Sequence, residues 1–436
     1  MRLKAEPLAS MCEAIVDCPH STPVWTNSGF VVLRNQNIKG GRLDLSSPSY
    51  TDEKHFKQRV RRMAPRAGDI VITREAPMGD VCKIPEGLIC CLGQRQVLLR
   101  PKAGVNPDYL LYALQSPSVQ DQIRWNEGTG STVSNIRIPV LEQIEIPRLG
   151  QAEEPVAAAL KSVDDKIDVN RRINQTLEAM AQAIFKSWFV DFDPVKAKIA
   201  AIQEGCDPLR AAMSAISGKP DAELEALPPE QYEQLAATAA PFPDEMEESE
   251  QGVIPRGWNV SKVETLLARL PAKTRYTKDQ ILEYAKVPVF EQGASILLGH
   301  HNGAASYQAC AENPMFIFGD HTCVTRLSCQ PFDISQNVIP LQGKGRATAW
   351  VYYAVKEKQK FQEYRRHWME LISKDVVVAA ADICLEFSKR VSNLHLQMEA
   401  HERQMQSLRE LRGTLLPKLL SGELSVESLT EIAGGS

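Results

Sequence analysis

The chain presents one order of segments twice, with the second copy about 240 residues after the first. In the first copy the segments are Gly29 to Gly41, Gly68 to Gly79, Gln96 to Lys102, Asp108 to Ser116 and Val140 to Leu149. In the second they are Val287 to Gly303, Pro314 to Leu327, Asn337 to Lys344, Ala347 to Lys358 and Val376 to Phe387. Solenoid repeats are far shorter than this. The pattern therefore predicts a duplicated α+β module.

Short β-branched runs punctuated by Gly, Pro and Asn make up most of each module. This composition is typical of a sheet of short strands with long surface loops. One helix is expected to pack against each sheet. The apolar spacing places it at Pro107 to Gln122 in the first module and at about Thr348 to Tyr364 in the second.

Each module is followed by a heptad pattern, which predicts a long helix with an apolar seam. The first seam is Leu160, Val163, Ile167, Asn170, Asn174, Leu177, Ala181, Ile184 and Trp188. The second is Phe387, Val391, Leu394, Met398, His401, Met405, Leu408 and Leu415, interrupted at Arg412. Asp193-Pro194 is expected to end the first helix, and Gly413 and Pro417 the second. Pairing the two helices with each other, antiparallel, buries both seams.

The polar seam residues leave two interpretations open. A buried Asn fixes the register of many coiled coils, and Asn170 and Asn174 suit that role. They also suit contact with a partner chain. His401 is interpreted as a partly exposed seam residue rather than a ligand.

The predicted fold class is α+β, with two pseudo-symmetric domains separated by two long antiparallel coiled-coil helices. The boundaries are 1–150 for the first module, 151–193 for the first long helix, 194–255 for an acidic Ala, Glu and Pro-rich connector, 256–383 for the second module, 384–425 for the second long helix and 426–436 for a flexible tail. The connector is expected to face solvent and to contain two short helical stretches.

Charge is distributed unevenly along a chain whose net charge is −4. Twelve acidic and two basic residues between Ala201 and Glu250 give that segment −10, so the rest of the chain carries +6. Six basic residues lie between Lys54 and Arg66 alone. Such a run forms either an ordinary solvated face or a surface for phosphate backbones.

Motifs for catalysis, metals and cofactors are absent from the sequence. It contains no P-loop, no Gly-x-Ser-x-Gly elbow and no His-Glu-x-x-His helix. The string nearest to an adenine-methylation loop, Asn313-Pro314-Met315-Phe316, lacks the second proline. The ten cysteines include no C-x-x-C pair and are expected to be reduced, with no metal site. Acidic residues interrupt the start, and no long apolar run follows, so we expect a cytoplasmic protein without membrane contact.

Three segments carry a family resemblance. The block LKSVDDKIDVNRRINQTLEAMAQAIFKSWFVDFDPV (Leu160 to Val195), preceded by GTGSTVSNIRIPVLEQIEIPRL, closely resembles the central region shared by specificity subunits of type I restriction-modification systems. LRELRGTLLPKLLSGEL (Leu408 to Leu424) resembles their distal region, and IVDCPHSTP (Ile15 to Pro23) resembles the opening of their first recognition domain. One departure is that the Gly-Thr-Gly-Ser-Thr loop of the first module has no counterpart in the second.

The resemblance implies a non-catalytic subunit that reads a split sequence of double-stranded DNA, one half per target-recognition domain. It also implies two methyltransferase subunits bound along the helices, and motor-nuclease subunits in the larger assembly. In that family S-adenosylmethionine, ATP and magnesium belong to the partner subunits, so no cofactor is expected here. The runner-up interpretation is a coiled-coil scaffold that joins protein partners without reading bases.

Residue type alone selects the candidate DNA contacts, with Lys and Arg on phosphates and polar side chains on base edges. In the first module these are Arg61, Arg62, Arg74, Gln94, Arg95 and the loop residues Thr129, Ser131, Thr132 and Asn135. In the second they are Arg275, Lys278, His300, His301, Asn302, Lys344 and Arg346. An ordinary surface role is the alternative for each.

Overall fold

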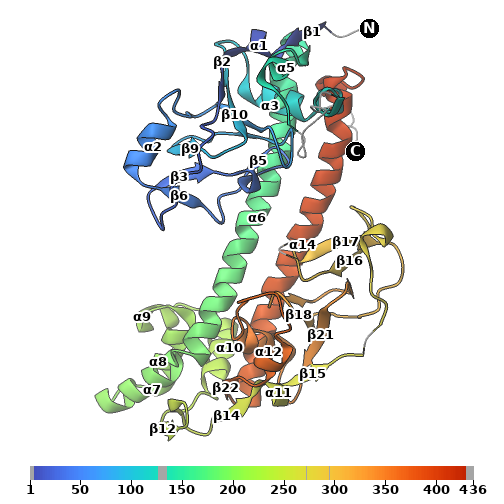
Figure 1. The fold of residues 1–436 in the computed structure, drawn as a ribbon. Helices are drawn as coiled ribbons and strands as arrows, with labels where there is room; N and C mark the ends of the chain where they lie inside the picture. The colour runs from blue at the N-terminus through green and yellow to red at the C-terminus, as the bar shows by residue number, and fades with distance from the viewer. Residues whose placement is uncertain (1–3, 126–134, 272, 294, 429–436) are drawn as a thin grey trace. The chain divides into compact units, whose positions relative to one another are not determined.

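The computed structural model describes residues 4–125, 135–271, 273–293 and 295–428, and the chain divides into two compact units. Unit 1 is Met1–Ile167 with Ser407–Ser436, and unit 2 is Asp168–Gln406. Both divisions fall inside long helices, α6 (Glu153–Phe189) and α14 (Ala381–Leu420). Each unit therefore contains one segment of each helix (Figure 1).

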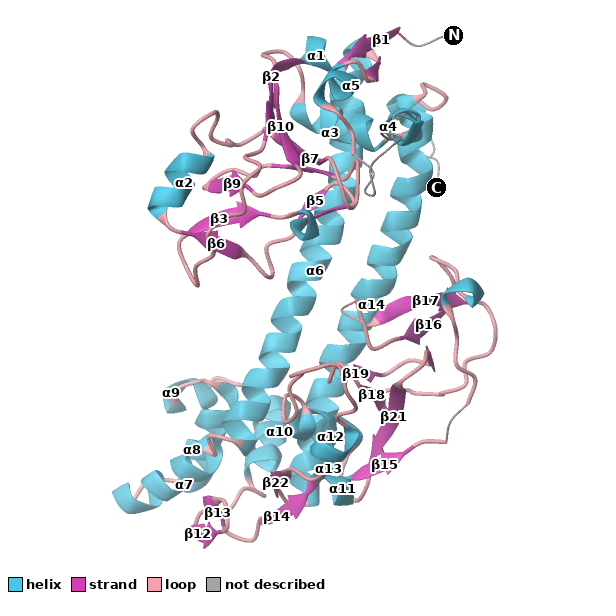
Figure 2. Ribbon diagram, viewed as in Figure 1, coloured by secondary structure: helices cyan, strands magenta, loops and turns pink. Residues whose placement is uncertain are grey.

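In unit 1 the largest sheet has the strand order β2-β10-β7-β8, with antiparallel neighbours. A second sheet has the order β6-β3-β9 (Figure 2), in which β3 and β9 are parallel. In addition, β1 pairs with β11. The strands are β1 (Lys4–Pro7), β2 (Cys12–Asp17), β3 (Phe30–Leu33), β4 (Ile38–Lys39), β5 (Arg42–Leu43), β6 (Ser49–Thr51), β7 (Ile70–Thr73), β8 (Val81–Lys83), β9 (Cys90–Leu92), β10 (Gln96–Pro101) and β11 (Glu145–Arg148). The helices are α1 (Leu8–Met11), α2 (Glu53–Arg59), α3 (Pro107–Gln115), α4 (Pro117–Trp125) and α5 (Ile138–Glu142).

Unit 2 has the same sheet topology. Its largest sheet has the order β15-β21-β18-β19, a second has β17-β16-β20 with β16 and β20 parallel, and β14 pairs with β22. The strands are β14 (Asn259–Lys262), β15 (Leu267–Arg269), β16 (Val287–Phe290), β17 (Leu297–His301), β18 (Met315–Gly319), β19 (Thr325–Ser328), β20 (Asp333–Ile334), β21 (Val338–Gly343) and β22 (Asp375–Val378). The helices are α11 (Val263–Leu266), α12 (Thr348–Val355) and α13 (Trp368–Ile372).

Element by element, the two units correspond in chain order. The strand β10 matches β21, α3 matches α12, and β11 matches β22 immediately before each long helix. The parallel pair β3-β9 also has its match in β16-β20. The duplication inferred from sequence is thus confirmed as a repeated topology.

Local sequence explains the central helix and strand of unit 1. The side chain of Asn106 accepts hydrogen bonds from the backbone N–H groups of Asp108 and Tyr109, which caps α3, and Pro107 fills its first position. Six residues of α3 are buried against the sheet. The run Val97 to Leu99 in β10 is buried because this strand lies between two others.

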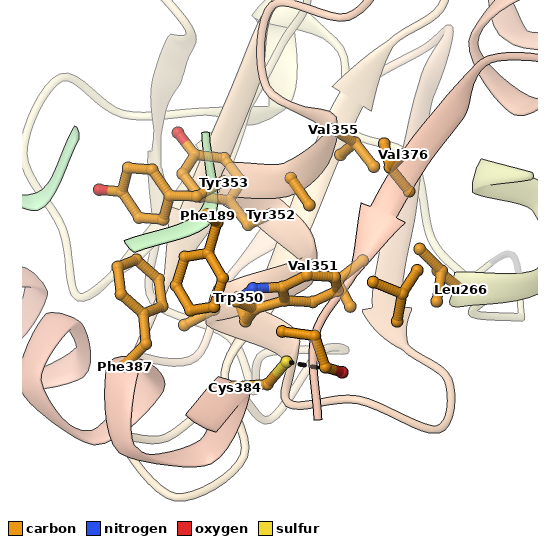
Figure 3. Packing of buried hydrophobic residues seen from close by; sticks show 14 of the residues in the cluster. Phe189, Leu266, Trp350, Val351, Tyr352, Tyr353, Val355, Val376, Cys384 and Phe387 are labelled. Carbon is orange, nitrogen blue, oxygen red and sulfur yellow. Dashed lines mark hydrogen bonds between the residues drawn. The ribbon is translucent and has the colours of Figure 1, made fainter. Parts of the chain in front are cut away.

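Aromatic side chains fill the core of unit 2 (Figure 3). Phe189 of α6 lies edge-on to Trp350 of α12 and to Phe387 of α14, with ring centroids 5.9 and 5.3 Å apart. Figure 3 also shows Cys384, whose thiol faces the Ala379 carbonyl oxygen at 3.7 Å. Both long helices and the module helix therefore share one core, which fixes the module to the helix pair.

In unit 2 the segments of α6 and α14 lie side by side and run antiparallel. The Asn170 amide donates to Gln404 Oε1 at 2.7 Å, and the Asn174 amide donates to the Met398 carbonyl oxygen at 2.9 Å. A later residue of α6 therefore contacts an earlier residue of α14, as in an antiparallel pair. All members of both predicted seams are buried or half-buried. Because both asparagines bond within the chain, the structure favours their role in register over contact with a partner.

The predicted end of the second long helix at Gly413 and Pro417 is wrong. Helix α14 continues through Gly413 and Pro417 to Leu420, because Leu416, Leu419 and Leu420 pack into the core of unit 1. Tertiary packing outweighs the helix-breaking tendency of these two residues.

The predicted module helices are also too long. Ser116 is extended, as expected of a residue before proline, and separates α3 from α4. In unit 2, α12 ends at Val355, and Glu357 adopts a left-handed conformation with φ of 63°. The segment after it is a loop.

The predicted connector is more structured than expected. It contains α7 (Asp193–Glu204), α8 (Pro208–Ser217), α9 (Asp221–Leu224), α10 (Pro229–Ala239) and the hairpin β12 (Met246–Ser249) with β13 (Gly252–Pro255). Its own buried cluster includes Met213, Leu224 and Leu235. These apolar residues are spread over separate short helices, so composition alone does not reveal the core.

Candidate nucleic-acid interface

At one end of its large sheet, unit 1 gathers loops around Glu75, in the turn between β7 and β8. Glu75 Oε1 accepts a hydrogen bond from Asn135 Nδ2 at 2.9 Å, and Oε2 lies 3.1 Å from Arg95 Nε. The backbone carbonyl of Glu75 accepts from Asn35 Nδ2 at 2.5 Å. These contacts connect the β7-β8 turn to the loop before α5, to the β9-β10 loop and to the segment after β3. Two of the predicted DNA contacts, Arg95 and Asn135, lie in this cluster.

Unit 2 builds an equivalent cluster around Asp320, in the turn between β18 and β19. Asp320 Oδ1 accepts from the Trp368 backbone N–H at 3.0 Å, and Oδ2 lies 3.8 Å from Arg366 Nε. Gln292, just after β16, accepts from the His321 backbone N–H at 3.1 Å. Each unit thus has an acidic residue in the same turn that holds the loop leading to α5 or α13.

Arg74 and Gln94 lie beside the Glu75 cluster but act inside the fold. The Arg74 guanidinium forms a two-pronged ion pair with Asp17 at 2.9 and 2.8 Å and donates to the Ile136 carbonyl oxygen at 3.0 Å. Its side chain is only 12% exposed. Gln94 is half-buried and donates to the His20 carbonyl oxygen at 2.7 Å. These two side chains position loops in this structure.

Arg61 and Arg62 lie just after α2, and both are exposed. The Arg61 guanidinium has no hydrogen bond or ion pair with any residue that the structure describes. Arg62 donates a long hydrogen bond of 3.4 Å to the Asp17 carbonyl oxygen. Both charges therefore remain available to an anionic partner. Thr129, Ser131 and Thr132 lie outside the described residues.

In unit 2, three predicted contacts are internal. His301 is buried, with Nε2 2.9 Å from Asp333 Oδ2 and its ring stacked on Tyr276 at 4.4 Å. His300 is also buried, and burial lowers its pKa while Nδ1 lies 2.9 Å from the Glu283 carbonyl oxygen. Arg275 donates to the carbonyl oxygens of Ser335 and Val338.

The other candidates of unit 2 are scattered. Lys278 and Asn302 are exposed near the β16-β17 sheet, and Lys344 is exposed after β21. Arg346 is half-buried and donates from Nε to the Ala379 carbonyl oxygen at 2.9 Å. None of these four lies in the Asp320 cluster as the hydrogen bonds of the described residues define it.

Three exposed aromatic residues are not among the contacts predicted from the sequence. Phe361 and Tyr364 of the loop before α13 are exposed, and in unit 1 Trp25 is exposed with the Arg34 guanidinium 5.3 Å from its ring centroid. Aromatic and basic side chains together are typical of nucleic-acid surfaces. In the sequence, the segment Lys358 to Arg366 indicates such a surface, because it contains four basic and two aromatic residues.

Comparison with known proteins places the chain in a family. Residues 22–179 match the family model described as type I restriction modification DNA specificity domain. The chain is 30% identical over 316 residues to the type I restriction enzyme HindI specificity subunit of Haemophilus influenzae, covering 63% of this chain and 67% of that protein. The chain belongs to the type I restriction-modification specificity subunits. A second such subunit, MjaIX of Methanocaldococcus jannaschii, is 22% identical over 411 residues, which are 86% of this chain and 82% of that subunit.

The fold agrees with this assignment. The crystal structure of the type I S subunit from M. genitalium matches with a TM-score of 0.50 over 96% of both chains, at 15% sequence identity. Among the described residues of this specificity subunit, no helix is both long and apolar enough to cross a membrane. The same residues include no group of three His, Cys, Asp or Glu side chains placed to hold a metal ion.

In both units of the specificity subunit a tyrosine of the module helix bonds to α6. In unit 1 the Tyr112 hydroxyl donates to Asp164 Oδ2 of α6 at 2.9 Å. In unit 2 the Tyr353 hydroxyl lies 3.1 Å from Glu178 Oε2 of α6 and 2.9 Å from His395 Nε2 of α14. The two tyrosines occupy matching positions in α3 and α12, so the loop clusters rest on modules that are anchored in the same way.

Proposed function

We propose that this specificity subunit reads a bipartite sequence of double-stranded DNA, with one half-site recognised by each unit. The observation that carries the proposal is the repeated loop cluster, built on one topology around Glu75 and Asp320 but presenting different side chains in each unit. Two domains with the same topology but different surface side chains at the loop cluster are suited to recognising two half-sites of different sequence.

The two kinds of DNA contact are assigned by chemistry. Exposed basic residues such as Arg61, Arg62 and Lys278 supply affinity by neutralising phosphates, which carries no sequence information. Arg95 is exposed at the Glu75 cluster and is suited to reading the edge of a guanine, since a guanidinium bonds two acceptors at once. The internal side chains Arg74 and His301 position the loops.

Partner docking is assigned to the helices. Val169, Ile173 and Met180 are exposed on the segment of α6 in unit 2, spaced by four and seven residues. This spacing places them on one helix face, away from the buried seam. An exposed apolar stripe on a helix suits a helix from a methyltransferase subunit.

Matching hollows support two copies of the same partner. In unit 1 a hollow of about 400 Å³ lies between the end of α3, β11 and the end of α14, lined by Pro117, Pro147 and Leu420. In unit 2 a hollow of about 290 Å³ lies between the end of α12, β22 and the end of α6, lined by Tyr353 and Val377 among others. One methyltransferase subunit per unit is the simplest occupancy. The subunit itself is non-catalytic in this proposal, and S-adenosylmethionine, ATP and magnesium are bound by the methyltransferase and motor-nuclease partners.

Salt dependence of DNA binding tests the phosphate contacts. Arg61→Ala with Arg62→Ala is expected to lower the slope of log affinity against log salt by about one for each phosphate that is no longer neutralised. Arg210→Ala is the matched control, because this arginine is paired with Asp221 and Glu225 in the acidic segment. An unchanged slope in the double variant would assign Arg61 and Arg62 to a solvated face.

The scaffold alternative makes a different prediction. A scaffold without base readout would assemble with methyltransferase subunits but bind all DNA sequences alike. The apolar stripe on α6 is the observation that favours a scaffold role, and it is compatible with both functions. Competition between the methylated sequence and random duplex separates the two.

A further inference from the structure

The loop Glu357–Arg366 of unit 2, between α12 and α13, presents aromatic side chains to solvent. Phe361 is 54% exposed and Tyr364 is 72% exposed. The Tyr364 ring lies 4.8 Å from the ring of His321, in the turn that contains Asp320. Tyr364 therefore belongs to the loop cluster of unit 2, and the Phe361 ring lies 6.3 Å from the ring of His367 at the end of the same loop.

The interior of this loop is held by a buried polar cluster. His367 is fully buried, with Nε2 3.0 Å from the Glu363 carbonyl oxygen and Nδ1 3.0 Å from Glu370 Oε2. The Gln359 amide, also buried, donates to the same Glu370 oxygen at 2.6 Å. The hydrogen bond from His367 holds the pKa of Glu370 below its usual range, with burial opposing it. A loop fixed from within in this way is preorganised for binding.

The same loop carries exposed positive charge on Lys360 and Arg366. The Lys360 ammonium has no partner among the residues that the structure describes. Arg366 is 81% exposed and only 3.8 Å from Asp320, an ion pair that water screens strongly. Arg365 is instead paired with Glu363 and Glu370, so the charges of the loop open to an anion include Lys360 and Arg366, with Lys358 exposed nearer its start.

We propose that this loop is a DNA-contact element of unit 2, in which Tyr364 and Phe361 pack against bases at an opened step of its half-site. Lys360 and Arg366 neutralise the flanking phosphates. The inference rests on the proposed function and specifies how the second half-site is held. Aromatic side chains stack on any base face, and apolar wedges open base steps in duplex DNA. Basic neighbours supply the phosphate attraction that such packing needs.

Aromatic-to-alanine substitution tests the packing. The probe is the duplex that the wild-type subunit and its methyltransferase protect, with 2-aminopurine placed at successive positions of each half-site. Wild-type binding should raise the fluorescence at one step of one half-site, since unstacking relieves quenching. Tyr364→Ala should abolish that rise and weaken binding by about 10-fold or more.

Two further variants isolate the cause. Met369→Ala removes an apolar side chain that is 70% exposed on the neighbouring helix α13, and it should leave affinity and fluorescence unchanged. Lys360→Ala with Arg366→Ala should lower the salt slope by about one to two while the fluorescence rise persists in the complex that still forms.

Each outcome has a distinct meaning. If Tyr364→Ala and Phe361→Ala bind with wild-type affinity and fluorescence, the inference is overturned and the proposed function stands. If they lose methyltransferase assembly on size-exclusion chromatography, the inference is likewise overturned and the loop is a protein contact instead. If the wild-type complex protects no bipartite sequence, the proposed function itself fails.

Discussion

The buried imidazole of His395 makes the stability of unit 2 depend on pH. His395 lies on α14 with Nε2 2.9 Å from the Tyr353 hydroxyl, and it is 6% exposed. Burial lowers its pKa to about 4, with Arg326 and Lys356 adding to the effect and Glu178 opposing it. The imidazole is therefore neutral in the folded protein at neutral pH. We expect His395→Gln to remove this pH dependence.

The size of the pH effect on the free energy of unfolding follows from the different proton affinities of His395 in the folded and unfolded protein. Unfolding restores the ordinary pKa of 6.5, so the unfolded chain takes up a proton on acidification before the folded chain does. The stability that His395 contributes is complete above pH 6.5 and is lost as the pH falls toward 4. Between about pH 7 and about pH 5 the loss is about 2 kcal/mol.

Neighbouring acids do not account for this change. Although burial opposes its ionisation, Lys356 holds the pKa of Glu178 below its usual range, so Glu178 loses its contribution only below that range. Burial raises the pKa of Glu399, which makes its own contribution grow as the pH falls. Both carboxyls, together with Glu402 and the tyrosines of α12, remain in the variant, so the difference between the two proteins isolates His395.

Urea unfolding followed by tryptophan fluorescence measures the effect. Trp188 and Trp350 are buried in the core of unit 2 and report its unfolding. The wild-type protein should lose about 2 kcal/mol more than His395→Gln between about pH 7 and about pH 5. Equal losses in the two proteins would refute the assignment of a neutral, buried imidazole.

Two further predictions concern unit 1 and the helices. Asp164→Asn removes the charge that Tyr112, Arg42 and Arg412 share, and it should destabilise unit 1 by about 3 kcal/mol, seen as faster hydrogen exchange in α3. Ile173→Glu with Met180→Glu should leave the helical circular dichroism unchanged but prevent co-elution with the methyltransferase, whereas normal co-elution would exclude this stripe as the docking face.

Sequence periodicity predicted the parts of the fold that depend on long apolar patterns. The two seams are buried or half-buried as expected, because exposing their apolar side chains to water is unfavourable. Asn170 and Asn174 form hydrogen bonds with the opposite helix. The extension of α14 past Gly413 and Pro417 runs against the local signals, although the predicted bounds of the long helix, 384–425, included it. The extension is stabilised by the packing of Leu419 and Leu420 in the hydrophobic core of unit 1.

Most of the candidate site was beyond prediction because residue type does not reveal pairing. Arg74 was proposed as a DNA contact, but its partner Asp17 lies 57 positions earlier in the sequence. His301 similarly pairs with Asp333. Conversely, the basic and aromatic residues of Lys358 to Arg366 were a signal in the sequence, but such a charge run is usually a solvated face, and the exposure of Tyr364 beside the Asp320 cluster is what favours binding.

In the proposed function, each unit reads its own half of a bipartite target. The direct measurement is a cycle of base and side-chain substitutions, in which binding of each single-base variant of the target is measured with Arg95→Ala in unit 1 and Tyr364→Ala in unit 2. We predict that each protein variant couples by about 1 kcal/mol or more to bases of one half-site only, Arg95 through the base edge that it reads and Tyr364 through the sequence-dependent cost of opening its base step, and that the two half-sites differ. Coupling of both variants to the same bases, or a target without a spacer, would contradict the account.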